Sequence, residues 1–124
     1  MKYTICIFAV LALVGCNDDE TEATCDASTV PIGTGDAARG MGLFSTCGTS
    51  SCHGDDGDTG LGGKMSERVP ALSDAEIAKT IKCGTDTPAI SGSMIAQGES
   101  EGGTLSDQEI ADVIAHLRVT FPNP

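Results

Sequence analysis

One short stretch of the chain carries the side chains best suited to chemistry. It runs from Phe44 to Gly57 and reads FSTCGTSSCHGDDG. Cys47 and Cys52 are separated by four residues, and His53 directly follows the second cysteine. Two thiols can form a disulfide, whereas two thiols and an adjacent imidazole can also hold a haem. The usual spacing for haem attachment, C-x-x-C-H, is about two residues tighter, so the stretch alone leaves both interpretations open.

The chain begins with a segment typical of exported lipoproteins. Lys2 precedes an apolar run from Ile5 to Val14 that is too short to remain as a membrane-spanning helix. The run ends in Leu-Val-Gly-Cys, which resembles the bacterial lipobox. Residues 1–15 are therefore predicted to be a lipoprotein-type signal peptide, and Cys16 the lipidated residue; the alternative is an ordinary signal peptide with Cys16 an incidental thiol. The prediction is an extracytoplasmic protein, lipid-anchored to a bacterial membrane on the periplasmic side or at the outer membrane.

Composition limits the partners and the core. The formal net charge of −11 disfavours nucleic acid, and any docking partner is expected to present a basic patch. Without the signal peptide, Phe44 and Phe121 are the only aromatic residues. A small domain with so few aromatic side chains is expected to need disulfides, a metal or a cofactor. The cysteines left to explain are Cys25, Cys47, Cys52 and Cys83.

The mature chain divides into a tether and one domain. Residues 16–35 are acidic and rich in threonine and glycine, and are predicted to be a flexible tether. Residues 36–124 are predicted to form the folded domain. Asp36 is the predicted N-cap of a first helix, in which Gly40 and Gly42 are expected to permit close contact with another helix.

Two further helices begin with the same pattern, Leu-Ser-Asp-x-Glu-Ile-Ala. Ser73 and Glu76 can form a capping box, and Gly84 suits the end of that helix. Ser106 and Glu109 repeat the box at the start of the last helix. The last helix has one apolar stripe, formed by Ile110, Val113, Ile114 and Leu117. With no strand pattern, the predicted fold class is all-α with long glycine-rich connections.

From about Asp36 to Phe121 the chain resembles the small single-haem c-type cytochromes of bacteria. The features that carry the resemblance are, in chain order, Gly40-Met41-Gly42-Leu43-Phe44, the group Cys47, Cys52, His53 and Gly54, Pro70-Ala71-Leu72, Met94, and the C-terminal LSDQEIADVIAHLR. The resemblance implies a cytochrome c-like fold, with three to four short helices around one haem. It also implies electron transfer with redox partner proteins, and no enzymatic turnover.

The resemblance assigns roles to particular residues. Cys47 and Cys52 would bind haem c covalently, and the small spacer between them would loop out. His53 would be the proximal iron ligand and Met94 the distal one. Covalent haem attachment is predicted more firmly at Cys52 than at Cys47, because Cys52 directly precedes His53 as in the usual motif.

Other residues are implied on the proximal side. Pro70 and Leu72 would line it, and the Pro70 carbonyl would accept a hydrogen bond from the second histidine nitrogen. Met41, in the first helix, and Met65, in the proximal-side loop, are competitors for the distal position. His116 is expected to be a partly exposed packing residue at the edge of the apolar stripe.

A haem-free alternative uses the same cysteines. In it Cys47 pairs with Cys52 and Cys25 with Cys83, giving a disulfide-stapled extracytoplasmic binding module. A Cys25–Cys83 disulfide is also compatible with the haem protein. A zinc site at Cys47, Cys52, His53 and Cys83 is disfavoured, because adjacent Cys and His rarely chelate one tetrahedral ion without strain.

Overall fold

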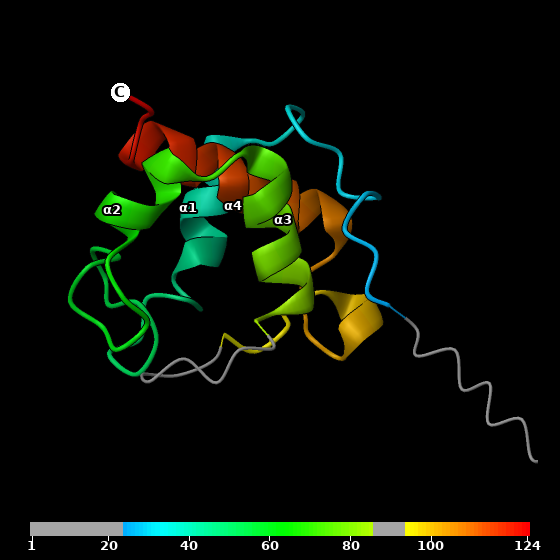
Figure 1. Cartoon of the computed structure of the whole chain (residues 1–124), viewed down its shortest axis with the longest axis horizontal. Coiled ribbons are helices and arrows are strands. Elements are labelled where there is room, and N and C mark those ends of the chain that lie inside the picture. Colours follow the sequence, from blue (N-terminus) through cyan, green and yellow to red (C-terminus); the bar gives the residue numbers. More distant parts are fainter. Residues whose placement is uncertain (1–23, 86–93) are drawn as a thin grey trace, which may run out of the picture.

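The regular structure of the chain is helical. The computed structural model describes residues 24–85 and 94–124. It contains four α-helices and two 3-10 helices: α1 (Ala37–Phe44), α2 (Met65–Arg68), η1 (Val69–Ala71), α3 (Asp74–Cys83), η2 (Glu99–Glu101) and α4 (Asp107–Thr120). Within the described ranges, extended pairing is limited to an isolated bridge between Gly98 and Leu105. This part of the chain is therefore all-α, as predicted (Figure 1).

The three longer helices begin at their predicted caps. Asp36 Oδ1 accepts hydrogen bonds from two N–H groups in the first turn of α1, at 2.9 and 3.2 Å. Ser73 and Glu76 form a complete capping box at the start of α3. Ser106 and Glu109 form the same box on α4. These side chains satisfy N–H groups that have no partner within the helix, so the predicted start signals are confirmed.

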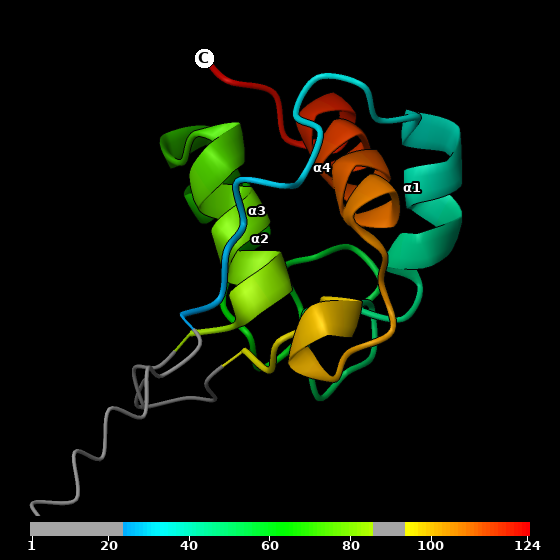
Figure 2. The ribbon, with the colours of Figure 1, turned by 90° about the vertical axis from the view of Figure 1, so that its right-hand side faces the viewer.

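The helices α1 and α4 pack closely, and Figure 2 shows them side by side. Gly40 lies at their crossing, where a Cβ atom would collide with the backbone carbonyl of Asp112. The predicted close contact is confirmed at Gly40. At Gly42 it is wrong, because nothing lies within 4 Å of the position that a Cβ atom would take. Residues two apart on a helix do not share a face, so the two glycines meet different surroundings.

A buried carboxylate occupies the same crossing. Asp112 is 1% exposed. Its Oδ1 atom accepts hydrogen bonds from the Asp36 N–H at 2.7 Å, and from Gln108 Nε2 and Arg39 Nη2 at 3.2 Å each. Burial acts to raise the pKa of Asp112, but these donors hold it below its ordinary value. The ionised side chain thus joins the start of α1 to α4.

Residues 24–35, which the sequence assigned to the tether, pack against the helices. Cys25 forms a disulfide with Cys83 at the end of α3, with 5.7 Å between the two Cα atoms. Val30 is 3% exposed and belongs to the core. The folded unit therefore extends upstream of Asp36, because a covalent bond and an apolar anchor hold this segment down.

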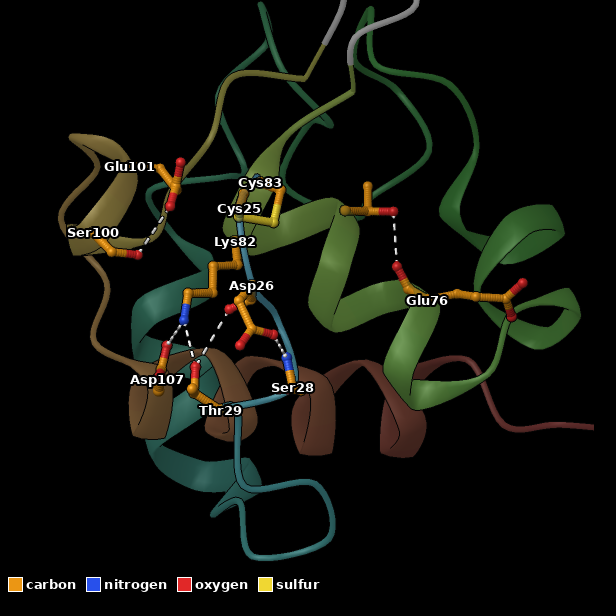
Figure 3. The surroundings of a disulfide bond; sticks show 11 residues. Cys25, Asp26, Ser28, Thr29, Glu76, Lys82, Cys83, Ser100, Glu101 and Asp107 are labelled. Atoms are coloured by element: carbon orange, nitrogen blue, oxygen red, sulfur yellow. Dashed lines mark hydrogen bonds and ion pairs between the residues drawn. A yellow bond between two sulfur atoms is a disulfide. The ribbon is translucent and has the colours of Figure 1, made fainter. Parts of the chain in front are cut away.

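A buried lysine reinforces the attachment of this segment. Lys82 is 5% exposed, and its ammonium group donates to Thr29 Oγ1 at 2.6 Å. The same nitrogen lies 2.8 Å from Asp107 Oδ1 at the start of α4. Figure 3 shows these three side chains meeting beside the disulfide. A buried ammonium is tolerated only when it is paired, and here it links α3, α4 and the N-terminal segment.

The core lies along α4. Its predicted apolar stripe is confirmed, since Ile110, Val113, Ile114 and Leu117 are each 3% exposed or less. Phe44 is buried at the end of α1, and Phe121 packs at the edge of the core. His116 lies in the partly exposed position expected for it, with its ring 5.4 Å from the ring of Phe44.

The export signal lies outside the described residues. The predicted signal peptide and Cys16 fall within residues 1–23, and the structure describes neither. Among the helices that it does describe, none has the length and apolar character needed to cross a bilayer.

Candidate functional site

A largely apolar cavity of about 340 Å³ lies between the helices. Cavities of a few hundred Å³ are typical of cofactor and small-molecule sites. Cys47, His53 and Met94, which the sequence singled out for ligand chemistry, all line it. The apolar part of the lining comes from the end of α1, from α2 and η1, and from α3 and α4: Phe44, Met65, Val69, Leu72, Ile77, Ile81, Val113 and Leu117.

Turns after α1 bring Cys47 and His53 to the same cavity. The N–H groups of Cys47 and Gly48 both donate to the Phe44 carbonyl, at 2.8 and 2.9 Å, and end the helix. The His53 N–H then donates back to the Cys47 carbonyl at 3.1 Å. The spacer between the two cysteines therefore forms a closed loop.

The two thiols differ in their surroundings. Cys47 is half-buried on the cavity wall, whereas Cys52 is exposed and is not part of the lining. Burial raises the pKa of the Cys47 thiol. The sequence pointed to Cys52 as the more direct attachment point, but the structure brings Cys47 to the cavity. Both cysteines are free thiols, so the Cys47–Cys52 disulfide of the binding-module alternative is not formed.

Glycines pack directly against His53. The Gly60 N–H donates to the His53 carbonyl at 3.0 Å. A Cβ atom on Gly62 would lie only 2.8 Å from Cε1 and Nδ1 of the imidazole. The loop can approach the ring this closely only because these positions lack side chains. The glycine-rich sequence that follows His53 therefore builds one wall around the imidazole.

The imidazole is half-buried and neutral. Its Nδ1 atom makes no hydrogen bond with the described residues. The Pro70 carbonyl, expected to be the acceptor, does not take that role in this structure. Burial lowers the pKa of His53 by more than the nearby backbone of Gly63 raises it. The ring is thus uncharged at neutral pH, which is the form that ligates metals.

Two methionines reach the cavity. Met94 lines it and packs against the core. Met65 also lines it, so it remains a competitor as a ligand. Met41 lies elsewhere: it is 63% exposed and lines a separate cavity of about 370 Å³ next to His116.

An arginine that the sequence did not single out holds the η1 wall of the cavity. Arg118, near the end of α4, donates to the carbonyls of Val69 and Leu72 and to Asp74 Oδ1. Leu72 lines the cavity, while Pro70 lies half-buried in η1 outside the lining. The only sequence signal was a basic residue in the last helical turn, which usually just complements the helix dipole.

The donor set suits iron in a porphyrin better than a bare metal ion. In the described ranges no group of three or more His, Cys, Asp or Glu side chains is arranged to hold a metal. The Cys83 sulfur is taken up by its disulfide, so the zinc set considered from the sequence does not assemble. An imidazole, a thioether and a thiol on an apolar wall are instead the groups that hold a c-type haem. The residues present therefore fit such a group.

Comparison of the chain with protein-family models, with curated proteins and with solved structures gave no match.

Proposed function

We propose that the protein is an electron-transfer haemoprotein of the kind it resembles, the small single-haem c-type cytochromes, with a cytochrome c-like fold around haem c. The observation that carries the proposal is the convergence of Cys47, His53 and Met94 on one apolar cavity.

Each residue has a defined task in this proposal. Cys47 and Cys52 would bind the porphyrin as thioethers, and His53 and Met94 would be the proximal and distal iron ligands. Leu72 and its apolar neighbours exclude water from the site. Bound haem would supply reversible one-electron chemistry at iron, and a methionine ligand would raise its reduction potential. With His53 and Met94 both bound to iron, no coordination position would be left for a substrate, so the proposed role is that of a carrier and not of an enzyme.

The proposal includes a location and a type of partner. Export followed by lipidation at Cys16 would hold the carrier on the extracytoplasmic side of a bacterial membrane. The net charge of −11 favours redox partners that present a basic patch.

One observation favours the alternative, a haem-free binding module. The Cys25–Cys83 disulfide is present, and disulfides stabilise small domains that lack a cofactor. The same disulfide is equally compatible with a haem protein. The free thiols at Cys47 and Cys52 do not fit the alternative, which requires both pairs.

An absorption spectrum tests the proposal. The full-length protein is produced in a host with haem-attachment machinery, and its haem bands are expected to survive extraction with acidic organic solvent. The control is the double variant Cys47→Ser/Cys52→Ser, from which any haem should be extracted. A folded, colourless wild-type protein with Cys47 and Cys52 bridged to each other would establish the binding module instead.

A second experiment tests the distal ligand. Met94→Ala is expected to keep its covalent haem, to lose reduction potential, and to bind added cyanide or carbon monoxide. Met65→Ala is the matched control, because this methionine lines the same cavity. If Met65→Ala loses reduction potential and binds cyanide or carbon monoxide while Met94→Ala does not, Met65 is the ligand.

A further inference from the structure

The residue just beyond α3 holds the backbone of Met94. The Thr85 N–H donates to the Met94 carbonyl at 3.0 Å. In the other direction, the Met94 N–H donates to Thr85 Oγ1 at 2.9 Å. Both backbone groups of Met94 are therefore bound by a single residue, which itself lines the cavity.

The residues after Met94 continue along the end of α3. The Gln97 N–H donates to the Ile81 carbonyl at 2.9 Å, and the Gly98 N–H donates to the Lys82 carbonyl at 3.2 Å. Gly84, with φ of 73°, allows the close approach, since a Cβ atom there would lie 2.8 Å from the Ala96 nitrogen. Residues 94–98 are thus docked on a helix end that is fixed elsewhere.

That helix end is fixed by covalent and ionic contacts. Cys83 is joined to Cys25, and Lys82 is paired with Asp107 and Thr29 (Figure 3). Through its two hydrogen bonds, Thr85 therefore connects the backbone of Met94 to this fixed helix end.

We infer that Thr85 is the positioning residue for the distal ligand, an inference that rests on the proposed function. Met94 can act as a ligand only while its backbone stays where the thioether reaches into the cavity. The Thr85 hydroxyl contributes by accepting the Met94 N–H. Its removal leaves that N–H unpaired and increases the population in which Met94 has left the site.

The test compares three variants of the haem-loaded full chain. Thr85→Val removes the hydroxyl at nearly constant volume, and Thr85→Ser keeps it. Thr120→Val is the matched control, because Thr120 lies outside this cavity and its hydroxyl donates within α4, to the His116 carbonyl at 3.0 Å. The measurements are the cyanide affinity of the ferric protein, its reduction potential, and exchange of the Met94 amide hydrogen.

For Thr85→Val we expect cyanide affinity to rise about fivefold to tenfold, as the loss of one hydrogen bond implies. The reduction potential should fall and the Met94 amide should exchange faster, while Thr85→Ser and Thr120→Val match the wild type. Thr85→Ala replaces Thr85→Val if the latter accumulates poorly.

Different results would overturn the role of Thr85 and the proposed haem function on which that role rests. Haem-loaded Thr85→Val with wild-type potential and cyanide affinity would overturn the role of Thr85 alone, as would an equal change in Thr120→Val. A wild-type protein without covalent haem would overturn the proposed function itself, and the ligand role of Met94 with it.

Discussion

Two regions of the molecule differ in whether their buried polar groups have partners. The helix side comprises residues 24–44, 73–85 and 105–120, and the cavity side comprises residues 45–72 with Met94. On the helix side, the buried charges of Asp112 and Lys82 each have hydrogen-bond and ionic partners. On the cavity side, the buried His53 Nδ1 atom has none among the described residues, and the cysteines are unpaired thiols.

The difference separates stability from function. The helix side is closed by contacts within the protein: a disulfide, a helix crossing and a continuous apolar stripe. The cavity side consists largely of glycine-rich loop around an apolar space, with groups that bind ligands. A buried polar atom without a partner costs stability, whereas paired buried charges hold elements together, so the two sides should respond differently to mutation.

The largest effect is expected from the disulfide on the helix side. Replacing both cysteines, Cys25→Ser/Cys83→Ser, should lower the free energy of unfolding by about 2–4 kcal/mol, because the unfolded chain gains freedom. Urea denaturation measures this, and haem attachment at Cys47 should survive. An intact mass that is unchanged by reductant would contradict the disulfide.

The helix crossing provides the next contrast. Gly40→Ala should destabilise the protein by about 1–3 kcal/mol, because the added methyl group meets the backbone of Asp112. The position of a Cβ atom at Gly42 is open, so Gly42→Ala should instead raise the free energy of unfolding by about 0.5–1 kcal/mol through better helix propensity. The midpoint of urea unfolding reports both, and similar values for the two variants would refute the close crossing.

The buried carboxylate gives the helix side a pH dependence. Because the folded-state pKa of Asp112 is lowered, its contribution is complete above the ordinary aspartate pKa of about 3.9 and is lost as the pH falls through the folded-state value. Asp112→Asn should therefore lower the free energy of unfolding by about 1–2 kcal/mol at neutral pH and by less in acid.

Unfolding curves at neutral and acid pH measure this change. Asp55→Asn, at an exposed loop position, is the control and should alter neither curve appreciably. A penalty for Asp112→Asn that is the same at both pH values would contradict the ionised state of the buried carboxylate.

The smallest effect concerns the thiols of the cavity side. In protein produced without haem, iodoacetamide should alkylate Cys52 several-fold faster than Cys47, because Cys52 is exposed while burial raises the pKa of the Cys47 thiol. Peptide mass spectrometry measures both rates, and in urea they should converge. Equal rates in buffer would mean that the cavity wall does not form without its ligand.

Local features were readable from the sequence. The helix starts at Asp36, Ser73 and Ser106 and the buried stripe of α4 agree with prediction, because capping and amphipathic periodicity depend on residues within a few positions of one another. The set of Cys47, His53 and Met94 was also named from the sequence, and the structure places all three on one cavity.

Other features depend on residues far apart in the chain. That Cys25 meets Cys83, that Val30 enters the core and that Lys82 is buried against Asp107 follows from how α3, α4 and the N-terminal segment pack. Cysteine counting had named Cys25–Cys83 as a candidate pair, but only the packing of these elements decided it. The difference between Cys47 and Cys52 has the same origin, because the cavity that Cys47 faces is walled by distant residues of α3 and α4. Helix boundaries were thus set by near neighbours, whereas the disulfide, the buried ion pair and the facing of each thiol were set by tertiary packing.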